Sequence, residues 1–223
     1  MLLWRRSIIR LSNIRPGRIR LRIPLRRRGI FIPERCDINH PGIETSSGPL
    51  AQGASQAVGI ALGLRMDHRK NHVYLVMGDG EQDEGQIWEA VMFAGKEKLH
   101  NLTGIIDRNN IQIDGYTENV MPIENLRAKY EAFNWHVLEV DGHNIQEFID
   151  ACNEAKAIYE KPTVIICHTI AGKGVDFMEE RFEWHGIPPG AADVTGAPPK
   201  GEQGKVALDE LRTLGGRIKS EHE

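Results

Sequence analysis

Two short polar stretches, GDG at 78–80 and DRNN at 107–110, each follow an apolar run and carry side chains that could bind a metal ion. Asp79 in the first stretch and Asn109 in the second are thirty residues apart, about the length of one β-α-β unit. Because ligands bind at the carboxyl ends of parallel strands, we expect these two side chains to face the same crevice.

A carboxylate, an amide oxygen and a nearby backbone carbonyl form an oxygen-rich site, which Mg²⁺ or Ca²⁺ accepts when a bound phosphate completes its shell. Gly78 and Gly80 would let the backbone approach an anion closely and offer N–H groups to it. Either stretch alone is also typical of an ordinary turn. The two together, each at the end of a predicted buried strand, favour a metal–diphosphate site.

The elements that must position these residues alternate along the chain. Four apolar runs are predicted as buried strands, and segments of helical periodicity separate them; the runs are 73–77, 102–106, 136–140 and 162–167. Pro49 fits the first position of a helix, and Asn144 fits an N-cap with Glu147 as its capping-box partner. This alternation predicts an α/β fold, a parallel sheet with helices on both faces.

Charge divides the chain unevenly. Residues 1–35 hold eleven arginines and one acidic residue, Glu34, whereas the whole chain has 28 basic and 31 acidic residues and a net charge of −3. Such a split usually marks a tail joined to a domain. A nucleic-acid or membrane-binding arm and an organelle transit peptide are two interpretations of this segment. We favour a third, that the segment is not the natural start of the domain.

The resulting domain prediction has four parts: an atypical arginine-rich segment at 1–35, a binding domain at 36–186, a Gly- and Pro-rich linker at 187–204, and a helix with a tail at 205–223. No apolar run reaches the roughly 18 residues of a membrane span. The three cysteines have no metal-ligand spacing. The body is acidic and lacks interleaved basic and aromatic residues, so we expect no nucleic-acid partner and no membrane partner.

Residues 42–186 resemble the cofactor-binding half of transketolase. The matching stretches appear in family order and cover about two-thirds of the chain; they are PGIETSSGPLAQG (41–53), GDGEQDEGQIWEA (78–90), DRNNIQIDG (107–115), VDGHN (140–144), KPTVIICHTIAGKG (161–174) and EWHG (183–186). The resemblance implies a thiamine diphosphate-binding fold, of which this chain holds only the diphosphate-binding domain. The family's upstream Ser-x-Gly-His stretch has no counterpart in residues 1–39.

The resemblance also implies roles for particular residues. Asp79, Asn109 and the Ile111 carbonyl would hold Mg²⁺ or Ca²⁺ on the diphosphate of thiamine diphosphate. Glu84 and His185 would act in catalysis, with His185 reaching both cofactor and sugar, and Glu89 would lie at a subunit interface. The remaining implied cofactor contacts are Gly48, Pro49, Leu50 and Gly80, together with Asn109 and His185; Gly78 is a candidate contact from the GDG turn itself.

The function implied is that of half a transketolase: a chain that transfers a two-carbon ketol unit between sugar phosphates, in the pentose phosphate pathway, once a C-terminal subunit completes the site. We expect a homo- or hetero-oligomer in the cytoplasm. Two alternatives stay open. One is a non-catalytic binding module that keeps the fold, and the other is a component of a different thiamine diphosphate enzyme, such as a 2-oxo acid dehydrogenase.

Overall fold

The computed structural model describes residues 8–12 and 48–214, and its centre is a five-stranded sheet of order β1-β2-β3-β7-β6. The strands are β1 (Ile8–Ser12), β2 (His72–Gly78), β3 (Leu102–Arg108), β6 (His136–Asp141) and β7 (Thr163–His168). Four of them are parallel, whereas β1 pairs antiparallel with β2. All four strands predicted from apolar runs are therefore present.

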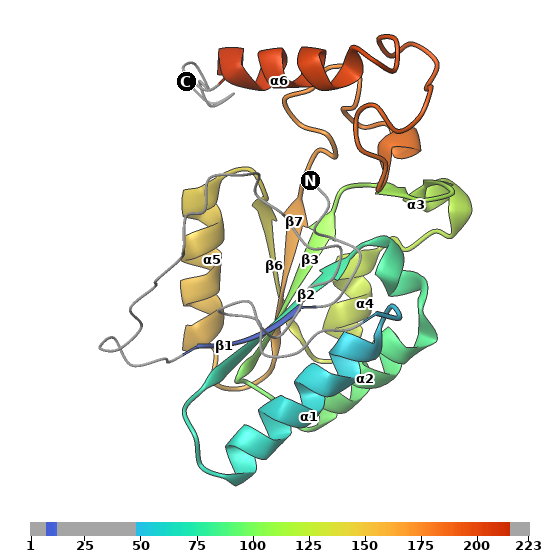
Figure 1. Ribbon diagram of the computed structural model, residues 1–223. Coiled ribbons are helices and arrows are strands. Elements are labelled where there is room, and N and C mark those ends of the chain that lie inside the picture. Colours follow the sequence, from blue (N-terminus) through green and yellow to red (C-terminus); the bar gives the residue numbers. More distant parts are fainter. Residues whose placement is uncertain (1–7, 13–47, 215–223) are drawn as a thin grey trace.

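Helices cover both faces of this sheet (Figure 1). On one face, α1 (Gln52–Met66), α2 (Gly85–Lys96) and α4 (Leu126–Ala132) share one apolar cluster with alternate residues of β2, Val73, Leu75 and Met77. On the other face, α5 (Ile145–Ala157) packs with Tyr74 and Val76 in a second cluster. Because successive strand side chains point to opposite faces, β2 serves both cores. The predicted fold class, a parallel sheet with helices on both faces, is confirmed.

Two helix starts differ in detail from the prediction. Helix α1 begins at Gln52, so Pro49 is not at its first position. Ala51, just before the helix, adopts a left-handed conformation with φ 67°, and its N–H donates to a side chain from another segment, Glu81. Asn144 does cap α5, accepting from Glu147 N–H at 3.2 Å, but the Glu147 carboxylate accepts from Asp141 N–H instead of closing a capping box.

Short elements after β2 and β3 were not predicted. The 3₁₀ turn η1 (Gly80–Asp83) follows β2 directly. After β3 come the two-residue strands β4 (Ile111–Gln112) and β5 (Gly115–Tyr116), which pair with each other, and the short helix α3 (Thr117–Val120). These elements lie at the carboxyl ends of β2 and β3, where the polar stretches 78–80 and 107–110 are located.

Residues 170–214, here called the C-terminal unit, have an apolar core of their own. It contains Phe177, Met178, Trp184 and Ala207, and it joins η2 (Phe182–Trp184) to α6 (Gln203–Leu214). In Figure 1 this orange-to-red segment continues from β7 beyond the end of the sheet. Gln203, fully buried, accepts from Gly190 N–H at 2.7 Å and so ties the turns before α6 to the helix.

Positions 1–7, 13–47 and 215–223 lie outside the described residues. They include most of the predicted segment 1–35 and the end of the predicted tail. Residues 8–12 form a strand within the arginine-rich segment, which the sequence pattern did not predict. Helix α6 begins two residues before the predicted terminal helix at 205. The division itself stays a prediction.

Candidate functional site

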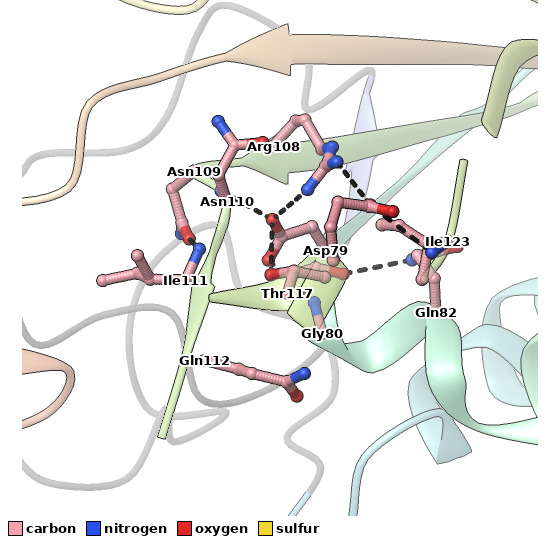
Figure 2. A network of polar contacts seen from close by, with 12 residues as sticks. Asp79, Gly80, Gln82, Arg108, Asn109, Asn110, Ile111, Gln112, Thr117 and Ile123 are labelled. Atoms are coloured by element: carbon pink, nitrogen blue, oxygen red, sulfur yellow. Dashed lines mark hydrogen bonds and ion pairs between the residues drawn. The ribbon is translucent and has the colours of Figure 1, made fainter. Parts of the chain in front are cut away.

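Asp79 lies at the centre of a polar network at the end of β2 (Figure 2). Its side chain is buried, and its Oδ2 accepts from Arg108 Nη1 at 2.9 Å, Asn110 N–H at 2.7 Å and Thr117 Oγ1 at 3.2 Å. Its Oδ1 accepts from Gly80 N–H at 2.7 Å. The donors on Oδ2 come from the end of β3 and from α3, so the carboxylate joins three separate segments and its orientation is fixed.

Arg108 is the cation of this network. Its guanidinium contacts three carboxylates, those of Asp79, Glu118 at 2.8 Å and Glu124 at 3.0 Å, and its side chain is 5% exposed. Burial lowers the pKa of Arg108, but hydrogen bonds and charge from Asp79 and Glu124 outweigh it and raise that pKa. Burial raises the pKa of Asp79, and the hydrogen bond from Arg108 opposes this shift. Each charge of the pair therefore depends on the other.

Asn109, in the turn between β3 and β4, and Ile111, the first residue of β4, lie near Asp79 (Figure 2). Asn109 Oδ1 accepts from Ile111 N–H at 3.1 Å, and its Nδ2 donates to Asp107 Oδ2 at 3.0 Å. The two hydrogen bonds orient the amide. A Cβ on Gly80 would lie 3.0 Å from Gln112 Oε1, so a larger residue there would require the Gln112 side chain to shift slightly.

The predicted contact loop 48–50 is tied to the same site through its neighbour Ala51. Glu81, on η1, accepts from Ala51 N–H at 2.6 Å and from Gly78 N–H at 3.3 Å. Gln82, the next residue, donates to the Gly78 carbonyl at 3.1 Å. The loop before α1 and the GDG turn are thus connected by one short segment of η1.

The remaining predicted site residues lie on other elements. Glu84, before α2, and Glu89, on α2, are both exposed. His185 directly follows η2 in the C-terminal unit and is partly buried. Phe182, also on η2, packs edge-on against Tyr116 of β5 with ring centroids 5.4 Å apart, so the EWHG turn lies next to the β4–β5 hairpin that contains Ile111.

The donor set fits a magnesium–diphosphate group. Within the described residues no cluster of three or more His, Cys, Asp and Glu side chains could hold an ion, so a cation here would need amide, carbonyl and phosphate oxygens beside the single carboxylate. Asp79 Oδ1 accepts one hydrogen bond from the described residues, whereas Oδ2 accepts three. The Oδ1 side is therefore the one suited to an ion, and hard cations accept such oxygen sets.

The fold and this strand-end site together define an α/β domain of the diphosphate-binding kind. Residues 31–201 match the family model described as the transketolase thiamine diphosphate-binding domain. The chain belongs to the transketolase family, and this domain is the part it contains.

Individual relatives agree with this assignment. The chain is 47% identical, over 73% of its length, to a 6-deoxy-6-sulfo-D-fructose transketolase subunit of Clostridium sp. (strain MSTE9), and 45% identical, over 68%, to an apulose-4-phosphate transketolase subunit of Phocaeicola vulgatus. The matches span 60% and 54% of those two proteins. The crystal structure of Campylobacter jejuni transketolase superposes with a TM-score of 0.64 at 30% identity, over 78% of this chain and 32% of that one. The chain thus spans little more than half of the two curated relatives.

Sequence reasoning missed the residues that hold the predicted ligands in place. Arg108, Thr117 and Glu81 were given no role, although all three are buried and hydrogen-bonded at the site. One signal was available for Arg108: an arginine two residues after the apolar run 102–106 needs an anionic partner if it is buried.

Proposed function

We propose that this chain is the thiamine diphosphate- and magnesium-binding half of a transketolase, which transfers a two-carbon ketol unit with a C-terminal subunit. The observation that carries the proposal is the juxtaposition of Asp79, Asn109 and Ile111 at the ends of β2 and β3, in a domain that matches this family. When bound, thiamine diphosphate would supply the carbanion stabilisation that transfer of a two-carbon unit requires.

The chain's own residues would anchor and orient. Asp79 Oδ1, Asn109 Oδ1 and the Ile111 carbonyl would hold the cation. Gly78 and Gly80 would let the backbone approach the diphosphate closely, but their N–H groups donate to Glu81 and Asp79 in this structure instead of being open to the anion as the sequence predicted. Gly48, Pro49 and Leu50 would contact the cofactor from the loop before α1. His185 would reach cofactor and sugar from the C-terminal unit. Glu84 would take part in catalysis from its position just before α2, where its exposed side chain could contact a second subunit.

The names of two relatives support a substrate class. One is named for a sulfonated sugar and the other for a sugar phosphate. We therefore expect a ketose with an anionic terminal group as donor, in carbohydrate metabolism; the cytoplasmic location stays a prediction. Both relatives are named as subunits, which supports a partner chain. Among the described residues, no helix combines the length and apolar character needed to cross a bilayer.

One observation favours the alternative of a non-catalytic module. Asp79 is already paired with Arg108, so the buried carboxylate is stable in the fold without a metal ion. In that case the chain would keep the fold and bind thiamine diphosphate weakly, with little dependence on Mg²⁺.

Calorimetry on the purified chain, with thiamine diphosphate in the presence and absence of Mg²⁺, separates these two functions. We expect Mg²⁺-dependent binding that Asp79→Asn abolishes, because this variant keeps the side-chain volume but loses the anionic ligand. Glu131→Gln, an exposed carboxylate on α4, is the matched control. Cofactor affinity unchanged in Asp79→Asn would contradict the metal assignment. Ketol transfer on adding the C-terminal subunit would then establish the activity.

A further inference from the structure

Glu81 is a buried carboxylate at the site to which neither the sequence motifs nor the family resemblance gave a role. It is 3% exposed and lies on η1, two residues after Asp79. One carboxylate oxygen accepts from Ala51 N–H at 2.6 Å, and the other accepts from Gly78 N–H at 3.3 Å. A single side chain thus bridges two backbone segments that both belong to the predicted cofactor site.

The backbone at Ala51 shows why this bridge matters. Ala51 has φ 67° and ψ −20°, a left-handed conformation that residues with a Cβ adopt at a cost in free energy. Such a conformation persists where the surrounding structure holds it. Ala51 is fully buried, and Glu81 accepts its N–H in a charge-assisted hydrogen bond. This bond is one of the contacts that hold the chain turned at Ala51, beside its burial in the apolar cluster.

The turn at Ala51 determines where the preceding residues point. Gly48, Pro49 and Leu50 come directly before it and are exposed, whereas α1 directly after it is anchored by Ala54, Ala57 and Ala61 in the core. Ala51 is also the N-cap of α1, which has no side-chain cap of its own. Glu81 therefore accepts the N-cap N–H from another segment, as the Glu of a capping box would from within the helix, and its negative charge suits a helix N-terminus.

We propose that Glu81 is a positioning residue for thiamine diphosphate: it holds the 48–50 loop and the GDG turn at a fixed separation, so that both can contact the cofactor together. This inference rests on the proposed function. Gln82 supports η1 from its other side, because its Oε1 accepts from the buried Tyr130 hydroxyl at 2.7 Å and its Nε2 donates to the Gly78 carbonyl. The segment that carries Glu81 is therefore hydrogen-bonded, through Gln82, to a buried residue of α4.

The geometric part can be tested without any ligand. Hydrogen exchange on the full chain should show slow exchange at the Ala51 and Gly78 amides, and Glu81→Ala should accelerate both while the amides of β3 stay protected. Glu131→Gln should change neither. Unaltered exchange at Ala51 in Glu81→Ala would overturn the proposed bridge.

The functional part uses a rescue. Calorimetry with thiamine diphosphate and Mg²⁺ should give a Kd for Glu81→Ala about tenfold or more above that of the unsubstituted chain, because a charge-assisted hydrogen bond is lost. Glu81→Gln should fall between, since an amide can accept from only one of the two N–H groups. Ala51→Gly in the Glu81→Ala background should recover part of the affinity, because glycine adopts the left-handed conformation without a Cβ penalty.

The outcomes separate the two ideas. If Glu81 has a merely structural role, Glu81→Ala should melt at a lower temperature, while its Kd for thiamine diphosphate at temperatures below melting stays unchanged and Ala51→Gly restores nothing. That result would overturn the positioning role and leave the proposed function standing. If the unsubstituted chain does not bind thiamine diphosphate, alone or with its C-terminal subunit, the proposed function fails and the positioning role fails with it, even where the exchange data show the bridge.

Discussion

The sheet body, residues 48–169 with β1, and the C-terminal unit, residues 170–214, bury polar groups in different ways. In the sheet body two of the buried groups at the site carry opposite charges and compensate each other: Asp79 pairs with Arg108 across two strand ends. In the C-terminal unit the deeply buried polar side chain is neutral. Gln203 accepts from Gly190 N–H and donates to the carbonyls of Ala192 and Pro198 at 3.1 and 3.0 Å.

The two kinds of burial have different consequences. The contacts that Asp79 makes with Arg108, Asn110 and Thr117 join segments 29 to 38 residues apart, so we expect their loss to affect the whole sheet body. The contacts of Gln203 span 5 to 13 residues and stay inside one small core. Charge and pH should therefore act on the sheet body as a whole, whereas loss of Gln203 should loosen only the C-terminal unit and the EWHG turn that it contains.

The largest effect is expected for Arg108→Met. The substitution leaves the buried Asp79 carboxylate without its cation and should lower the free energy of unfolding by about 3–5 kcal/mol, as measured by urea denaturation. Arg127→Met is the matched control: Arg127 also contacts two carboxylates, Glu131 and Glu139, but its side chain is 41% exposed, so we expect a loss of at most about 1 kcal/mol. Equal losses in the two variants would contradict the distinction between compensated burial and surface pairing.

Acid should destabilise the sheet body through His72. This side chain, 9% exposed at the start of β2, contacts Thr103 Oγ1 at 2.7 Å, and burial, then Lys156 and His100, lowers the pKa of His72 to about 4. The unfolded chain has a histidine pKa near 6.5, so it binds the proton first. The free energy of unfolding therefore keeps its full contribution from neutral His72 above pH 6.5. It falls by about 3 kcal/mol as the pH decreases toward 4.

Urea denaturation between pH 7 and pH 4.5 measures this change. In His72→Gln the amide can still hydrogen-bond to Thr103 but does not titrate, so the dependence of unfolding free energy on pH should become shallower. The remaining slope reports the carboxylates. An identical slope in the two proteins would show that His72 binds its proton equally in the folded and unfolded states, which would contradict a pKa lowered by burial.

Much of the sheet body could be predicted because its signals are local. The run VYLVM at 73–77 is apolar on both faces of the strand, and this alone predicts a strand buried on both sides. The spacing of Asp79 and Asn109 then predicts one shared crevice, since parallel strands end at the same edge. Residues 8–12 show why the edge strand was missed: five residues among arginines carry no pattern that specifies pairing with β2.

The rest of the site could not be predicted because its partners are distant in sequence. The stretch DRNN does not predict that Arg108 forms ion pairs with Asp79, Glu118 and Glu124. These contacts exist only once β2, β3 and the segment around α3 are packed together. The start of α1 is a similar case. Pro49 is a reasonable first helical residue on local grounds, but the tertiary hydrogen bond from Ala51 to Glu81 moves the helix start to Gln52.

The smallest effect is expected for Gln203→Leu, which tests most directly whether the two regions are independent. Leucine fills a similar volume but leaves Gly190 N–H and the carbonyls of Ala192 and Pro198 without their side-chain partner, which should cost about 2 kcal/mol. Because Gln203 contacts only the C-terminal unit among the described residues, hydrogen exchange should accelerate at 188–199 and leave the amides of β3 protected.

Gln203→Glu, which keeps the acceptor for Gly190 but loses both donated bonds, is the graded control for this prediction. If His185 acts from the C-terminal unit, both variants should also raise the KM for the sugar while the Kd of thiamine diphosphate changes less, since the proposed metal and diphosphate ligands lie on the sheet body. If protection were lost equally in β3, the two regions would unfold as one. The prediction that substitutions at Gln203 affect the His185 side of the site more than the Asp79 side would then be wrong.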